Sequence, residues 1–141
     1  MLVALILFFM PLFAFSEDFC IEEIQNPYPD SYINYAYRKN IEKALLESGH
    51  KISCKEGAKK IKARVELLKE APTAYTPTQR VSAYNMELRL NLSLGKEDKT
   101  FSVVVPYSQP GGGVGDLPRR QAVEDAFKII YLDILEFIKR R

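Results

Sequence analysis

Hydrophobic and polar residues alternate along residues 79–94, which is the clearest pattern in the chain. Every second residue from Tyr84 onward is apolar or aromatic, as in a strand that buries one face and exposes the other. The inner face is expected to hold Tyr84, Met86, Leu88, Leu90, Leu92 and Leu94. The outer face is expected to hold Ala83, Asn85, Glu87, Arg89, Asn91 and Ser93.

Neighbouring segments predict further strands. Residues 60–67 alternate, with Ile61, Ala63, Val65 and Leu67 expected inside and Lys60, Lys62, Arg64 and Glu66 outside. A hairpin turn is expected at residues 95–98, followed by a strand whose inner face carries Phe101, Val103, Val105 and Tyr107. Pro72 and Pro77 bracket a polar segment that is predicted to form a loop. A short apolar and acidic stretch at residues 20–24 predicts a first strand.

Apolar residues recur with helical spacing in two other segments. The first has one stripe formed by Ile33, Tyr37, Ile41 and Leu45. Asp30 or Ser31 is expected to cap the start of this helix, and Gly49 is expected to end it. A second helix is expected to begin at the cap Asp116 and to reach the basic end of the chain. Its apolar stripe is formed by Ala122, Val123, Ala126, Phe127, Ile130, Ile134, Phe137 and Ile138.

The predicted order is therefore strand, helix, three strands, helix. Packing both apolar stripes against the apolar face of one sheet is the economical arrangement in two layers. The pattern favours an α+β fold, in which two helices pack on one face of a small mixed sheet. No internal repeat or linker divides residues 17–141, which are expected to form a single domain.

The first sixteen residues, 1–16, have the composition of an export signal. Residues 2–15 are continuously apolar apart from Pro11, and Ala14 and Ser16 supply the small residues of a cleavage site before Glu17. A cleaved signal peptide is therefore expected. The apolar stretch is short for a membrane span, but an uncleaved membrane anchor is the alternative.

The chain has two cysteines, Cys20 and Cys54, which are too few for a four-cysteine zinc site. Outside the cytoplasm they can pair as a disulfide, and two free buried thiols are the alternative. Lipidation of Cys20 is not expected. Asp18 and Phe19 stand directly before it, where a lipoprotein signal requires small residues.

Composition and charge argue against several functions. The 141 residues carry a net charge of +2, which is too small to indicate nucleic-acid binding. Residues 1–37 contain five acidic and no basic side chains, so all 20 bases lie in the rest of the chain and give it a basic bias. The acidic pairs have no metal-ligand spacing. The single histidine, His50, has no catalytic partner pattern and is expected to be solvent-exposed. We therefore expect no enzyme activity, metal or cofactor.

Three other features leave alternatives open. The glycine-rich residues 108–115 match neither a P-loop nor a dinucleotide fingerprint, and are expected to form a connector or a partner-contact loop. The tyrosines at positions 28, 32, 35 and 37 either pack within the fold or form a binding surface. Lys62, Arg64 and Arg89 form either a solvated sheet face or an attractive surface for an anionic ligand.

The sequence resembles the LptE family, the lipopolysaccharide-assembly lipoproteins of Gram-negative outer membranes. The resemblance follows the order and spacing of elements over nearly the whole chain after the export signal. It includes Ile21, Ile24 and Asn26, the helix end at residues 46–49, the strands with residues 62–65 and 81–88, the glycine-containing loop, and the helix at residues 119–138.

The resemblance implies a non-enzymatic role at the periplasmic side of the outer membrane. LptE-like proteins sit as a plug in the LptD β-barrel and bind lipopolysaccharide through basic residues. By position and chemistry, the resemblance assigns that binding role here to Lys62, Arg64 and Arg89, and Arg80 is a further candidate. The family is lipidated on a cysteine directly after its signal, and this sequence departs from it at Cys20. A free periplasmic binding module for an anionic glycolipid or cell-wall fragment is the alternative function.

Overall fold

The computed structural model describes residues 17–109 and 117–140. The expected export signal, most of the glycine-rich segment and the expected cap Asp116 lie outside the described residues. No helix in the described ranges is long and apolar enough to span a bilayer. The elements in chain order are β1 (Asp18–Ile21), α1 (Ser31–Glu47), β2 (Lys51–Ile52), β3 (Lys59–Tyr75), β4 (Val81–Leu94), β5 (Glu97–Ser108) and α2 (Leu117–Lys139).

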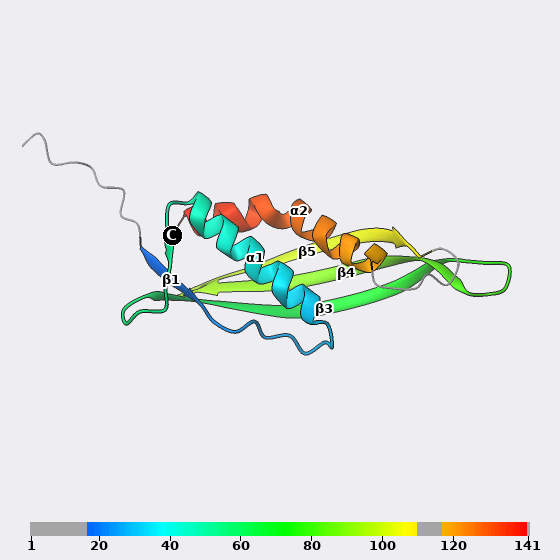
Figure 1. Ribbon diagram of the computed structural model, residues 1–141, viewed down its shortest axis with the longest axis horizontal. Coiled ribbons are helices and arrows are strands. Elements are labelled where there is room, and N and C mark those ends of the chain that lie inside the picture. Colours follow the sequence, from blue (N-terminus) through cyan, green and yellow to red (C-terminus); the bar gives the residue numbers. More distant parts are fainter. Residues whose placement is uncertain (1–16, 110–116, 141) are drawn as a thin grey trace, which may run out of the picture.

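The five strands form one mixed sheet in the order β2-β1-β3-β4-β5. β1 runs parallel to β2 and β3, whereas β3, β4 and β5 are antiparallel neighbours. Both helices lie on the same side of the sheet (Figure 1). The predicted α+β class and order of elements are confirmed. The structure adds the two-residue strand β2 and places β1 at Asp18–Ile21 rather than at residues 20–24.

The core lies between the helices and the inner face of the sheet. The predicted stripe of α1 and the predicted inner positions from Met86 to Leu94 of β4 are buried. Tyr37 lies in the middle of this core, where its hydroxyl donates a hydrogen bond of 2.7 Å to the carbonyl oxygen of Asn91. Its ring centroid lies 5.7 Å from that of Phe127 on α2. Burial raises the pKa of the Tyr37 phenol, so this donor stays protonated.

The two ends of α1 follow the sequence prediction. The Asp30 carboxylate accepts hydrogen bonds from the backbone amides of Tyr32 and Ile33, at 3.0 and 3.4 Å. These bonds satisfy two of the amides that a helix start leaves without a partner. After the helix, Gly49 adopts a φ of 79°, a left-handed conformation in which glycine is favoured.

A β-bulge in β3 changes which residues face the core. Between Val65 and Leu67 the register with β4 shifts by one residue, and Glu66 is the extra one. Because alternate residues of a strand point to opposite faces, one extra residue reverses the assignment of all that follow. Leu67 therefore pairs with Arg89 on the outer face, and the prediction that it faces the core is wrong. Glu70 takes an inner position instead.

The predicted loop between Pro72 and Pro77 is also wrong in its first half. β3 continues to Tyr75, and residues 76–80 form the turn. Pro72 cannot donate a backbone hydrogen bond, but β1 pairs with β3 only as far as Ile61, so β3 is an edge strand here. A register shift also follows Pro72. The β3–β4 hairpin consequently extends past the ends of both helices (Figure 1).

Arg119, in the first turn of α2, joins several elements through ion pairs. Its guanidinium contacts the carboxylate of Asp30 and, at 2.8 Å, that of Glu70. The hydroxyl of Tyr107 on β5 donates to the same Glu70 carboxylate. Burial lowers the pKa of Arg119, but the hydrogen bonds with Glu70 and Asp30 outweigh it and leave that pKa raised. This Arg119 network ties α2 to the cap of α1, to β3 and to β5.

A disulfide joins Cys20 of β1 to Cys54, which follows β2, with their Cα atoms 4.5 Å apart. Closing a loop of this length disfavours the unfolded chain by about 4 kcal/mol. The bond also occupies the Cys20 sulfur, so no thiol is free there to carry a lipid.

Replacing Leu90 with aspartate (Leu90→Asp) is expected to unfold the protein. Leu90 is fully buried on β4, where a carboxylate would have no partner. The free energy of unfolding in urea is expected to fall by more than about 4 kcal/mol. Val104→Asp is the control, because Val104 is 55% exposed on β5, and its effect is expected to stay below about 1 kcal/mol. A stable Leu90→Asp protein would show that the two faces are assigned the wrong way round.

Removing the charge of Arg119 (Arg119→Gln) is expected to lower the free energy of unfolding by about 2–3 kcal/mol, because two partly buried carboxylates lose their cation. Arg120→Gln is the matched control. Arg120 lies over the Tyr32 ring, 5.3 Å from its centroid, and its loss is expected to cost less than about 1 kcal/mol. Urea titrations followed by circular dichroism compare the two variants, and equal losses would contradict a special role for the Arg119 network.

Candidate anion-binding site

The outer face of the sheet carries three of the predicted ligand residues. Lys62 and Arg64 lie two residues apart on β3, and Arg89 lies on the neighbouring strand β4. All three residues are exposed, because both described helices lie on the other face of the sheet. The structure therefore brings Lys62, Arg64 and Arg89 together on one solvent-facing surface, called here the outer-face cluster.

Acidic neighbours pair with two members of the outer-face cluster. Arg64 Nη2 lies 3.0 Å from Glu66 Oε1, and Arg89 Nη2 lies 3.9 Å from Glu87 Oε1. The two arginine side chains are 54% and 44% exposed, so water screens both ion pairs. Exchanging either carboxylate for an anionic ligand therefore costs little.

Arg80 is not brought to the outer-face cluster. It lies in the turn between β3 and β4, where its backbone amide donates to Thr76 Oγ1 at 3.1 Å. Arg80 and Arg89 are nine positions apart along extended chain, a span of about 30 Å. Arg80 therefore cannot bind the same phosphate group as the outer-face cluster.

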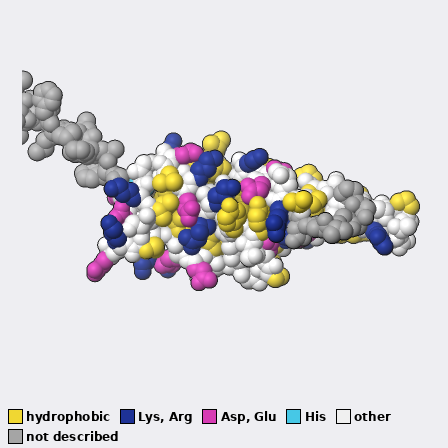
Figure 2. Space-filling view, in the orientation of Figure 1, with side chains coloured by type: hydrophobic (Ala, Val, Ile, Leu, Met, Phe, Trp, Pro, Cys, Tyr) yellow, Lys and Arg dark blue, Asp and Glu magenta, His cyan; other side chains and the backbone are white. Residues whose placement is uncertain are grey.

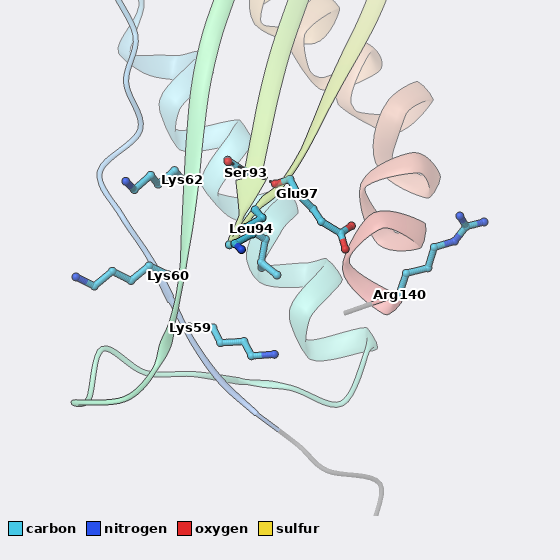
Figure 3. A pocket seen from close by; sticks show the side chains of 9 residues that line it. Lys59, Lys60, Lys62, Ser93, Leu94, Glu97 and Arg140 are labelled. Atoms are coloured by element: carbon cyan, nitrogen blue, oxygen red, sulfur yellow. Dashed lines mark hydrogen bonds between the residues drawn. The ribbon is translucent and has the colours of Figure 1, made fainter.

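A groove lies at the opposite end of the sheet, next to the β4–β5 hairpin, and has a volume of about 670 Å³. It is bounded by the first residues of β3, by the hairpin and by the residue that follows α2 (Figure 3). A tight turn shapes the hairpin, in which Leu94 pairs directly with Glu97 and Gly95 has a φ of 64°. This basic groove is lined by Lys59, Lys60, Lys62, Ser93, Leu94, Gly95, Lys96, Glu97 and Arg140.

Five of these nine lining residues are cations and one is acidic. Lys59 pairs with Glu17 at 2.6 Å, and Arg140 pairs with Glu136 at 2.5 Å. The Arg140–Glu136 pair is largely exposed and the Lys59–Glu17 pair is partly exposed, so water screens both ion pairs. The basic groove and the outer-face cluster share Lys62, so the two form one continuous cationic region.

Sequence reasoning placed Lys60 and Lys62 on the outer face but missed the groove. Its other cations come from distant positions, because Lys96 lies in the hairpin turn and Arg140 follows α2. From the sequence, Lys96 is explained as part of a charged turn, and Arg140 as a cation that suits the end of a helix. The pairing of β4 with β3 brings Lys96 near Lys60, and the packing of α2 along the sheet brings Arg140 to the same groove.

The other end of the molecule is nearly free of charge. Residues 71–85 and 104–109, called here the distal end, contain one charged side chain, that of Arg80. The rings of Tyr84 and Tyr107 stack with centroids 5.3 Å apart, and Tyr75 is 62% exposed. Figure 2 shows the contrast, with charged side chains crowding the body of the molecule and few at the end where the β3–β4 hairpin projects.

The tyrosines near α1 mainly pack within the fold. Tyr37 is fully buried, and Tyr28 and Tyr32 are partly buried against the core. The hydroxyl of Tyr32 donates to Glu124 on α2 at 2.6 Å, and this hydrogen bond is the main reason that the pKa of Tyr32 is raised to about 12. Tyr35 is 58% exposed and stays at the surface of the helix layer. The packing interpretation therefore applies to three of the four.

His50 is half-buried, so the prediction that it is solvent-exposed is wrong. Its ring packs edge-on against Phe19, with centroids 4.7 Å apart. Its Nδ1 atom accepts a long hydrogen bond of 3.4 Å from the backbone amide of Glu17. Among residues 17–109 and 117–140, no group of three or more His, Cys, Asp or Glu side chains is arranged to hold a metal ion.

No protein-family model matches this chain. An uncharacterized protein of Aquifex aeolicus (strain VF5) is 38% identical over 131 residues, which cover 93% of this chain and 91% of that protein. The chain therefore belongs to the same family as the Aquifex protein.

Several solved structures of similar outline are small bacterial lipoproteins. A minor lipoprotein from Acinetobacter baumannii aligns with a TM-score of 0.49 and 11% identity, over 86% of this chain and 92% of that one. The rare lipoprotein B from Shewanella oneidensis aligns with a TM-score of 0.46 and 15% identity, over 84% of this chain and 92% of that one. An uncharacterized lipoprotein B from Nitrosomonas europaea aligns with a TM-score of 0.46 and 11% identity, over 87% of this chain and 84% of that one. These values are too low to transfer a function to this chain.

Proposed function

We propose that this protein is a non-enzymatic component of lipopolysaccharide assembly at the outer membrane. In this role it binds lipopolysaccharide and docks, as a plug, into an LptD-like β-barrel. The observation that carries the proposal is the outer-face cluster of Lys62, Arg64 and Arg89, which leaves one face of a small rigid sheet cationic and open to solvent. The LptE resemblance of the sequence supplies the partner and the ligand.

The chemistry of the outer-face cluster supports an anionic ligand. Arginine presents a planar fork of donors that matches phosphate oxygens, and lysine adds a mobile point charge. The sheet holds the backbones of these residues in fixed register across β3 and β4. A ligand with several phosphate groups can therefore contact more than one cation without reordering the protein.

The distal end supports a protein partner. The centres of protein interfaces are depleted of charged residues and enriched in tyrosine, and the distal end has this composition. Its side chains also resemble binding surfaces built from tyrosine and small polar residues, which lose little conformational entropy when bound. Bulges and Pro72 disrupt the open edge of β3, which disfavours unspecific strand pairing.

The disulfide supports an exported location. Disulfides persist in the periplasm and are rare in the cytoplasm. In this proposal the protein works there without a lipid on Cys20, held by its barrel partner.

Neutralising the outer-face cluster (Lys62→Gln, Arg64→Gln and Arg89→Gln together) is expected to weaken lipopolysaccharide binding on the order of 100-fold, from about 1 kcal/mol for each cation near an anionic lipid. The matched control neutralises Lys39, Arg120 and Lys128, three cations of the helices. Surface plasmon resonance on immobilised lipopolysaccharide measures the affinities, and circular dichroism checks the fold. If both variants weakened lipopolysaccharide binding equally, total charge and not the position of the outer-face cluster would determine the affinity.

Purification of the tagged protein from its own outer membrane in mild detergent is expected to recover a large β-barrel in stoichiometric amount. Tyr75→Glu places a charge on the distal end and is expected to abolish this recovery. Tyr35→Glu is the matched control, because Tyr35 is similarly exposed but lies on α1. A monomer in the soluble periplasmic fraction would contradict the plug and favour a free binding module.

A further inference from the structure

We propose that the basic groove is a binding site for phosphate groups, either on a lipid headgroup or in a free polyphosphate. The site centres on Lys60, Lys62 and Lys96 and is distinct from the arginines of the outer-face cluster. This inference rests on the proposed function and deepens it, because it assigns the phosphate groups of the ligand to one place.

Lys60, Lys62 and Lys96 all line the basic groove. None of their ammonium groups lies within 4.0 Å of a carboxylate in the described part of the chain. Lys60 and Lys62 are alternate residues of β3, about 7 Å apart along the strand, and their side chains point to the same side (Figure 3). Like charges held this close repel each other. A multivalent anion between them would remove that repulsion.

Glu97 is the one acidic residue that lines the described groove. The Glu97 side chain extends toward α2 and Arg140, away from Lys60 and Lys62 (Figure 3). The Ser93 hydroxyl donates to the Glu97 backbone carbonyl at 3.5 Å, which closes the base of the hairpin. The Glu97 carboxylate therefore does not lie between Lys60 and Lys62.

A cluster of lysines favours phosphate over a carboxylate ligand. A lysine ammonium has three donors on a flexible stem, and it responds to charge density rather than to a planar shape. A phosphate group offers more charge and more acceptor oxygens than a carboxylate, so it can engage two ammonium groups at once. Leu94, which is 7% exposed, adds a small apolar surface to the lining of the groove, as suits a phosphate carried on an organic group.

The test uses the full chain and two probes, inorganic pyrophosphate and phosphatidylcholine vesicles that contain phosphatidic acid. The groove variant is Lys60→Gln with Lys96→Gln, and the matched control is Lys55→Gln with Lys128→Gln, which removes the same charge elsewhere. The groove variant is expected to bind the phosphatidic acid vesicles about 30-fold more weakly. The control is expected to stay within about 3-fold of the unchanged protein. Circular dichroism checks that both variants fold.

The two sources of phosphate are separated by the probes. Vesicle binding that pyrophosphate competes away, with amide shifts at Lys60, Lys62 and Lys96 in NMR spectra, supports a lipid headgroup. The same amide shifts without vesicle binding support a free polyphosphate. Equal losses in the groove variant and its control, or pyrophosphate shifts spread over all surface lysines, would overturn the site.

A third variant separates this inference from the proposed function. Arg64→Gln with Arg89→Gln leaves the groove intact. If it loses lipopolysaccharide binding while the groove variant keeps it, the groove inference fails and the proposed function stands. If the unchanged protein binds pyrophosphate in the groove but not lipopolysaccharide, the proposed function fails and the phosphate site stands.

Discussion

One extra residue in β3, Glu66, determines which side chains of β3 reach each face of the sheet beyond Val65. Without the bulge, strict alternation would turn Lys69 toward the core and Glu70 toward solvent. With it, Lys69 lies opposite Glu87 on the outer face, and Glu70 turns inward to meet Arg119 and Tyr107. The bulge thus keeps an unpaired cation out of the core and supplies the carboxylate on which the Arg119 network depends.

The Arg119 network and the basic groove lie at opposite ends of α2. Its 23 residues form a stiff element about 35 Å long. Arg119 fixes the first turn of α2 against Asp30 and Glu70, and the apolar stripe then directs the helix along the inner face of the sheet. Arg140 consequently reaches the β4–β5 hairpin. The position of Arg140 beside the groove therefore depends on how the far end of the same helix is held.

Sequence patterns predicted the parts of the fold that depend on local periodicity. The stripe of α1, the inner face of β4 and the cap at Asp30 all follow from spacing within one segment. The bulge at Glu66 and the strand through Pro72 depend on what lies beside β3, which no local pattern records. The groove is harder still to predict, because its cations come from β3, the hairpin turn and the end of α2.

This dispersed origin of the groove has an energetic consequence. Lys60 and Lys96 are neighbours only in the folded chain, so an anion that binds both of them binds the folded state alone. Such a ligand stabilises the fold in proportion to its affinity and concentration, and it offsets the repulsion that the clustered lysines impose when the groove is empty. The distal end carries almost no charge and offers no cation to that ligand apart from Arg80. An anion in the groove and a protein at the distal end can therefore bind without competing for the same surface.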